Sequence, residues 1–347
     1  MKIKSVIQVA AALLLSTLNH QLSTAFAQGS LTPPGAPASS MKSLDQIEPR
    51  TPISSAPFAI AKPGSYYLTT NVTVSAGNAI TINTSQVTLD LNGFTISSTA
   101  PSASGTGILL AATNTDVTIL NGHITGGVTN SAGVFSGSGF ANGIFYTNSS
   151  PFNVHVTGVS VSGCLSNGIQ IGVANSTIVE SCTVKTVGNY GIYADNVSRC
   201  TVKECGNTGI LSEMASDSRA DCVGNGVGIN SGNVQNCYGN NVGNGVGLGA
   251  TVANNSTGNS TAGYGMTAVN ANNCYASSSG ANPAISVNMA NNCYGQCSGS
   301  GTGLLVNGTA TGSFGYSFTG IGINAHIANS CTVGGGTTNI AFKYNMP

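Results

Sequence analysis

The apolar positions of this chain recur with a fixed spacing from residue 66 onward. The clearest marker is an apolar residue that directly follows Gly or Ala and returns after 18 or 19 residues: Ile192, Ile210, Ile229, Leu248, Met266, Ile285, Leu304 and Ile323. The second and fifth positions after each marker are small or β-branched in nearly every repeat. Alternate residues of a strand point to the same side, so this pattern predicts short strands that bury the same positions in every repeat.

A second recurring position, about eight residues after the marker, holds only Cys or Ser. Its members are Cys182, Cys200, Ser218, Cys237, Ser256, Cys274, Cys293, Ser313 and Cys331. A position confined to two small side chains over nine repeats indicates a packed interior in which Cys acts as a small apolar residue. We therefore expect a buried column here.

A repeat of about 19 residues, with Gly and Asn between short strands, is typical of a solenoid. The chain lacks the apolar residue at every sixth position that marks left-handed hexapeptide helices, and it lacks the Gly-rich, Asp-containing repeat of calcium-binding rolls. The remaining prediction is an all-β fold, a single-stranded right-handed parallel β-helix over residues 64–347. Wider gaps between Ile80, Ile108, Ile144 and Ile169 predict insertions in its first turns.

The N-terminal segment has the pattern of an export signal. Residues 1–27 contain Lys2 and Lys4, then an apolar run, then a small-residue site that ends at Ala27. A membrane anchor is the weaker interpretation because the run is too short for a bilayer core of about 30 Å. The sequence predicts a mature chain without a transmembrane span that is secreted, periplasmic or on the cell surface. Seven of the eleven prolines lie in residues 28–63, which predicts an extended lead-in.

The charge of the chain bears on its partners. Ten Lys and Arg balance ten Asp and Glu and are scattered along the sequence. Neutralising phosphates requires clustered cations, so we expect no nucleic acid partner. A metal site is disfavoured because the Cys column has no clustered His to complete a tetrahedral arrangement. We expect no cofactor.

Several segments of the N-terminal half resemble a known group of proteins. These are "MKSLDQIEPRTPI", "KPGSYYLTTNVTV" and "VTLDLNGFTI", the last echoed by "VTILNGHITGG". They resemble secreted bacterial right-handed β-helix proteins of the pectate-lyase-like superfamily, over roughly residues 41–342. The resemblance implies an extracytoplasmic, carbohydrate-related role. It does not select an activity, because the superfamily includes lyases, hydrolases, epimerases and adhesins.

Candidates for catalysis are few. Between Cys222 and Met346 the only charged side chain is Lys343. Asp195 and Glu213 lie one repeat apart, which would place them about 5 Å from each other, the separation of a retaining glycosidase pair or of two cation ligands. The alternative, which we favour, is two solvated carboxylates on an outer strand.

Other charged residues have simpler interpretations. The repeat aligns Arg199 with Asp217, which predicts a surface ion pair. His155 and His326 alternate with apolar residues and are expected to point outward. Neither His123 nor His155 has a recognisable catalytic partner in the sequence.

The residue after each column Cys or Ser should point outward and form a second column. Its members are Thr183, Thr201, Arg219, Tyr238, Thr257, Tyr275, Tyr294, Phe314 and Thr332. The aromatic members Tyr238, Tyr275, Tyr294 and Phe314 are candidate carbohydrate-binding residues, because aromatic rings stack on sugars. Alternatively, neighbouring aromatic residues stabilise a sheet without a ligand. Another candidate patch comprises Phe135, Phe140, Phe145, Tyr146 and Phe152.

The ten cysteines of an exported chain would suggest five disulfides by number alone. Cysteines in register on adjacent turns, however, have parallel side chains about 4.8 Å apart, farther than the roughly 3.8 Å between the Cβ atoms of a disulfide. The column cysteines are therefore predicted to be buried thiols. The state of Cys164, Cys205, Cys222 and Cys297, outside the column, stays open.

Together these features predict an exported β-helix protein that binds carbohydrate without catalysis or serves as a cell-surface structural rod, with a polysaccharide as the candidate partner. The alternative is a polysaccharide lyase or glycoside hydrolase that acts on an extracellular polysaccharide.

Overall fold

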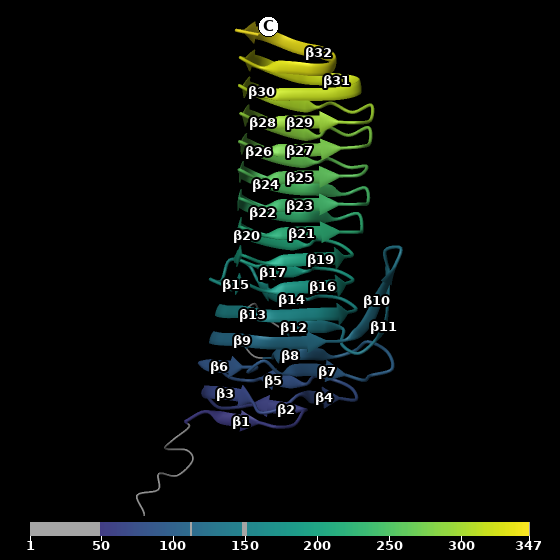
Figure 1. The fold of residues 1–347 in the computed structure, drawn as a ribbon. Helices are drawn as coiled ribbons and strands as arrows, with labels where there is room; N and C mark the ends of the chain where they lie inside the picture. Colours follow the sequence, from purple (N-terminus) through teal and green to yellow (C-terminus); the bar gives the residue numbers. More distant parts are fainter. Residues whose placement is uncertain (1–48, 112, 148–150, 347) are drawn as a thin grey trace, which may run out of the picture. The chain divides into compact units, whose positions relative to one another are not determined.

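The computed structural model describes residues 49–111, 113–147 and 151–346. The predicted signal segment and most of the lead-in lie outside these residues. The chain divides into Met1–Pro49 and Arg50–Pro347, and the second unit contains the fold. It is a right-handed parallel β-solenoid of about 15 turns, each of about 19 residues, and no helix occurs in the described parts of the chain (Figure 1). The predicted fold class is confirmed.

Each turn crosses three faces of parallel strands, which we name A, B and C in chain order. The strands confined to face A are β2 (Phe58–Ile60), β5 (Ile80–Ile82), β8 (Thr106–Leu110), β12 (Asn142–Tyr146), β14 (Ile169–Gly172) and β17 (Ile192–Ala194). Those of face B are β1 (Thr51–Ile53), β3 (Gly64–Leu68), β6 (Val87–Asp90), β15 (Ile178–Glu180) and β18 (Asn196–Ser198). Those of face C are β4 (Val72–Val74), β7 (Thr95–Ser98), β16 (Thr183–Val187), β19 (Thr201–Cys205), β21 (Arg219–Cys222), β23 (Tyr238–Asn241), β25 (Thr257–Ser260), β27 (Tyr275–Ser278) and β29 (Tyr294–Cys297).

Longer strands continue across a corner between faces. Two run from face B to face C: β9 (Thr115–Thr125) and β13 (Phe152–Cys164). Six run from face A to face B: β20 (Ile210–Ser216), β22 (Val227–Gln235), β24 (Val246–Asn254), β26 (Met266–Asn272), β28 (Ile285–Asn291) and β30 (Leu304–Thr311). The final strands, β31 (Phe314–Asn329) and β32 (Thr332–Tyr344), each begin on face C and continue through faces A and B. Two short strands, β1 and β2, lie within the predicted lead-in and pair with β3 and β5.

The Cys/Ser column lies inside the solenoid, and the structure shows why both residues fit. The Ser218 hydroxyl donates a hydrogen bond to the carbonyl of Ser216, at 2.7 Å. The Cys200 thiol makes the same contact with the carbonyl of Ser198, at 3.2 Å. Each column residue therefore donates to the backbone two residues earlier, a role that Ala or Val cannot fill. The column therefore requires a side chain that is small and that also donates a hydrogen bond.

The residue before each column position forms the corner between faces B and C. It has a positive φ in successive turns, at Arg199, Asp217, Asn236, Asn255, Asn273 and Asn292. Asn adopts this left-handed conformation more readily than most other residues. The recurring Asn-Cys-Tyr motif thus places Asn at the corner, Cys inside and Tyr outside.

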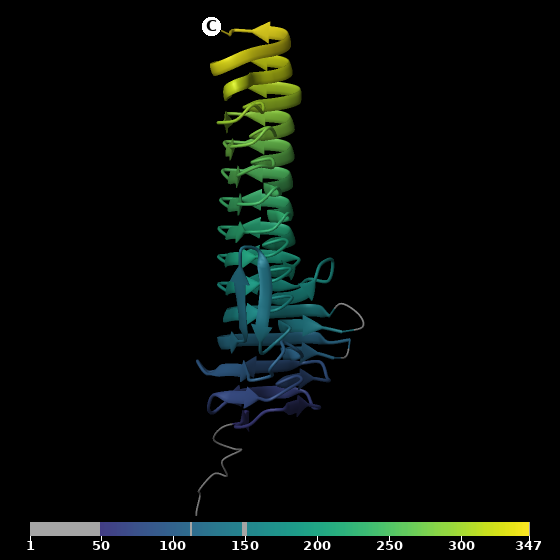
Figure 2. The ribbon, with the colours of Figure 1, turned by 90° about the vertical axis from the view of Figure 1, so that its right-hand side faces the viewer.

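One N-terminal insertion forms a hairpin of β10 (Gly127–Ser131) and β11 (Val134–Ser138), an antiparallel pair separate from the main sheet. The hairpin extends beside the turns that follow it (Figure 2). Phe135 lies over Gly188 and Gly206, where a Cβ atom would meet its side chain at 3.3 and 2.9 Å. Glycine at these two positions leaves room for Phe135 and also for the backbone carbonyls of Leu165 and Gly188 in the preceding turns, which an added Cβ atom would meet more closely.

Candidate functional site

Face C carries the predicted outward column in unbroken register. Backbone pairing aligns its nine members from Thr183 to Thr332, turn by turn. A second outward column lies two residues further along each strand, and its members are Lys185, Lys203, Asp221, Asn240, Asn259, Ser277, Gln296 and Tyr316. Aromatic side chains thus stand beside amides and hydroxyls over the C-terminal half of the face.

The aromatic residues of three consecutive turns stack on one another. The ring centroids of Tyr275 and Tyr294 are 5.3 Å apart with an interplanar angle of 21°, and those of Tyr294 and Phe314 are 4.7 Å apart at 13°. Gly334, from the next turn, lies against the Phe314 ring, since a Cβ atom there would overlap it. Tyr275 and Tyr294 are each 37% exposed. Partial burial, with a smaller contribution from the neighbouring Tyr294, raises the pKa of Tyr275.

Tyr238 is separated from this stack by Thr257 and has different partners. The guanidinium carbon of Arg219 lies 4.4 Å from the centroid of the Tyr238 ring. Arg219 also donates to Asp221 at 2.8 and 3.2 Å, and these hydrogen bonds raise its pKa. The Asn259 amide donates to the Tyr238 hydroxyl at 2.9 Å. Asn259 is not among the residues predicted to form the site, although strand alternation places it beside the aromatic column.

The favoured interpretation of Asp195 and Glu213 as two solvated carboxylates is wrong for Asp195, which is buried, and fits Glu213, which is exposed. The Asp195 carboxylate is buried, with 7% of the residue exposed, and it accepts hydrogen bonds from the backbone N–H groups of Ala174, Asn175 and Thr177. Glu213 is exposed, although its backbone N–H donates to the Asp195 carbonyl at 3.0 Å. Asp195 and Glu213 are therefore neighbours along the stack of turns, but only the Asp195 side chain has a structural role. Asp195 fixes the loop that follows β14.

The prediction of an ion pair between Arg199 and Asp217 is wrong. Arg199 instead forms an ion pair with Glu180, in the preceding turn. Asp217 accepts a hydrogen bond from Asn236 at 3.0 Å, as part of the polar corner column. His155, which lacks a partner in the sequence pattern, has its Nε2 atom 3.5 Å from a Glu180 carboxylate oxygen. The corner residue Arg199 reaches back by one turn, which the repeat alignment does not reveal.

His123, His326 and the second aromatic patch, all within the described residues, do not form a site. His123 is exposed, and His326 contacts Phe342 edge to face at 5.3 Å. The five aromatic residues proposed as a patch do not form one surface, because Phe140 is fully buried and Phe135 covers the glycines beneath the hairpin. Phe145 and Tyr146 stack on each other at 5.8 Å.

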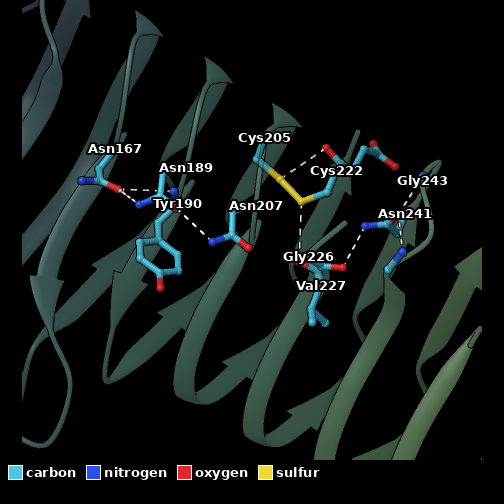
Figure 3. Close-up of a disulfide and its surroundings, with 12 residues drawn as sticks. Asn167, Asn189, Tyr190, Cys205, Asn207, Cys222, Gly226, Val227, Asn241 and Gly243 are labelled. Carbon is cyan, nitrogen blue, oxygen red and sulfur yellow. Dashed lines mark hydrogen bonds between the residues drawn. A yellow bond between two sulfur atoms is a disulfide. The ribbon is translucent and has the colours of Figure 1, made fainter. Parts of the chain in front are cut away.

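A disulfide joins Cys205 and Cys222 on adjacent turns of face C, with Cα atoms 4.6 Å apart (Figure 3). The strand register is irregular there, because Glu204 adds a residue with positive φ before Cys205. Only regular strands hold in-register side chains parallel, and the irregular register at Glu204 removes that restriction for Cys205 and Cys222. The other eight cysteines, which include the whole column, are buried free thiols. Asn167, Asn189 and Asn207 form a hydrogen-bonded ladder nearby, with links of 2.9 and 3.0 Å.

Face B has a feature that the sequence did not predict. A hollow of about 140 Å³ lies between its two outward columns and is lined by residues that include Asn196, Met214, Asn233 and Gln235. Met214 and Met289 on this face are 56% and 53% exposed. The hollow has no aromatic residue in its lining, in contrast to face C.

Neither a protein-family model nor a curated protein matches this chain. Among the described residues, no group of three or more His, Cys, Asp or Glu side chains is arranged to hold a metal ion. The same part of the chain contains no helix of the length and apolarity that a membrane span requires.

Proposed function

We propose that this chain is an exported glycan-binding protein without catalytic activity and that face C is its binding surface. The observation that carries the proposal is the pair of outward columns, in which Tyr238, Tyr275, Tyr294 and Phe314 stand beside Asn240, Asn259, Ser277 and Gln296. Sugar rings combine apolar C–H faces with hydroxyl groups. Aromatic side chains suit the first, and amides and hydroxyls suit the second.

Export is supported by the signal-like pattern of residues 1–27 and by the Cys205–Cys222 disulfide. Disulfides persist mainly in oxidising compartments outside the cytosol. We therefore propose a secreted, periplasmic or cell-surface location. The resemblance of the N-terminal half to the pectate-lyase-like superfamily agrees with a carbohydrate-related role.

Two other roles compete with this proposal. A lyase or hydrolase that uses Asp195 and Glu213 is disfavoured, because three backbone N–H groups already occupy the Asp195 carboxylate. A purely structural role at the cell surface is the stronger competitor, since stacked aromatic residues stabilise a sheet by themselves. The partial exposure of Tyr275 and Tyr294, at 37% each, leaves both side chains accessible to a ligand and supports the binding role.

The test is affinity electrophoresis of the protein through gels that contain soluble polysaccharides, combined with an assay for newly released reducing or unsaturated ends. We expect retention by at least one polysaccharide and no product. Replacing Tyr238 and Tyr275 by Ala should abolish retention, whereas replacing the exposed Met214 and Met289 of face B should not. Product release would assign an enzyme, and the absence of both effects would assign the structural role.

A further inference from the structure

The aromatic column on face C contains one gap. Tyr238, Thr257 and Tyr275 occupy the same outward position in three consecutive turns. Where consecutive turns both carry rings, the centroids are 5.3 or 4.7 Å apart. The spacing between adjacent turns of the solenoid thus equals the distance between two stacked rings. Tyr238 and Tyr275 are two turns apart, about 10 Å, so the space above Thr257 has the width of one inserted ring.

We propose that this gap binds a single pyranose ring of a neutral glycan between Tyr238 and Tyr275. The proposal rests on the glycan-binding function above and narrows it to one subsite and one ligand class. The two tyrosine rings form the walls of the subsite, and Thr257 forms its floor.

The other ring faces of the column are already covered. Tyr294 is stacked between Tyr275 and Phe314. The second face of Phe314 lies against Gly334, and Arg219 stacks on Tyr238. A sugar can contact the edges of these rings, but stacking requires an open face. The gap at Thr257 is the position in this column where a ligand ring can stack on two tyrosines.

Hydrogen bonds hold the walls in place. Asn259 donates to the Tyr238 hydroxyl at 2.9 Å and accepts from the Ser277 hydroxyl at 2.7 Å. The Tyr275 hydroxyl donates to Gln296 at 3.1 Å. Side chains that are ordered before binding lose less entropy when the ligand enters.

The chemistry of the gap favours an uncharged sugar. Thr257 and Asn259 are neutral, and the nearest guanidinium, on Arg219, is neutralised by its two hydrogen bonds to Asp221. A pyranose with mainly equatorial hydroxyls has two flat apolar faces and a polar rim. Its faces match the tyrosine rings, and its rim matches the hydroxyls and amides around them.

The decisive variant is Thr257→Phe, which fills the gap and completes the aromatic column. It should fold, because it extends a stack that the protein already forms. The matched control is Thr183→Phe, which adds a ring at an exposed position of the same column, away from the gap. Retention would be measured with hydroxyethyl cellulose, xyloglucan, galactomannan and polygalacturonate, and melting curves would confirm folding.

We expect Thr257→Phe to weaken retention by the neutral polysaccharides roughly tenfold or more, because the sugar loses two stacking contacts. Thr183→Phe should leave retention unchanged. A second pair of variants covers the case in which Thr257→Phe does not fold. Tyr275→Ala should lose retention because it removes one wall of the subsite, whereas Tyr344→Ala should keep it. Tyr344 is an exposed aromatic residue, at 55%, and lies on face B, away from the subsite.

Failure of this inference is distinguishable from failure of the proposed function. Normal retention of Thr257→Phe, or normal retention of Tyr275→Ala where Thr257→Phe does not fold, would overturn the subsite and leave binding elsewhere on face C intact. Retention by polygalacturonate alone, or competition by a single-stranded oligonucleotide, would overturn the neutral sugar as ligand. If no polysaccharide retains the unaltered protein, the proposed function fails, and the inference fails with it.

Discussion

Ser218 provides a quantitative test of how the interior column is built. Its hydroxyl accepts a hydrogen bond from the Cys200 N–H at 3.1 Å and donates one to the Ser216 carbonyl at 2.7 Å. The residue is 4% exposed, so water does not replace these contacts. Ser218→Ala leaves the Cys200 N–H without its acceptor, whereas the Ser216 carbonyl still accepts from the Arg199 N–H at 3.1 Å.

The expected cost follows from this difference. A buried polar group without a partner costs about 1–3 kcal/mol, and only the N–H is orphaned here, so we expect Ser218→Ala to lose about 1–2 kcal/mol of unfolding free energy. Ser218→Cys is the matched control. In the preceding turn, Cys200 accepts the N–H of Cys182 through its sulfur at 3.5 Å, so Cys should replace Ser at a cost below about 1 kcal/mol.

The assay is urea unfolding followed by circular dichroism, together with amide exchange of the segment that contains Cys200. Local exchange is needed because turns of a solenoid can unfold separately. Ser218→Ala should accelerate exchange at Cys200, and Ser218→Cys should not. Equal stability of the two variants would refute the view that the column requires a hydrogen-bonding side chain. The restriction of the column to Cys and Ser would then follow from side-chain size alone.

Further predictions concern the cysteines and the acidic residues. Thiol titration of the denatured, unreduced protein should count eight thiols, and reduction of the Cys205–Cys222 disulfide should add two more. A count of zero before reduction would contradict the assignment of the column cysteines as free thiols. In the folded state the same titration should be slow, since burial shields the thiols and raises the pKa of Cys164 to about 12. Asp195→Ala should lose about 2 kcal/mol or more, because it removes a charged acceptor of three N–H groups, while Glu213→Ala should be nearly neutral. Equal effects of these two substitutions on the melting temperature would show that Asp195 has no special structural role.

The features that follow the repeat were predictable from the sequence. The register of the aromatic column, for example, follows from the turn length and from the alternation of side chains within a strand. Tyr275 and Tyr294 are 19 residues apart, and Phe314 follows after 20 because one residue is inserted, a shift that the repeat pattern reveals, so their alignment could be predicted. The stacking of their rings on one another could not, because it depends on side-chain torsion angles that the repeat does not specify.

Features that depart from the repeat were not predictable. The extra residue Glu204 changes the local register and brings Cys205 to Cys222. Asp195 is buried because the loop after β14, in the preceding turn, presents three N–H groups to it, and that loop does not follow the strand pattern of the repeat. Arg199 reaches back to Glu180 because a long side chain at a corner can contact either neighbouring turn.

Hydroxyl-radical footprinting with mass spectrometry tests most directly whether face C binds a glycan. Side-chain oxidation would be compared with and without a saturating concentration of a polysaccharide that retains the protein. We predict protection of Tyr238 and Tyr275, with unchanged oxidation of Met214 and Met289, which are 56% and 53% exposed on face B. Protection of the two methionines with unchanged oxidation of the tyrosines would place the ligand on face B and contradict the assignment of the binding surface to face C.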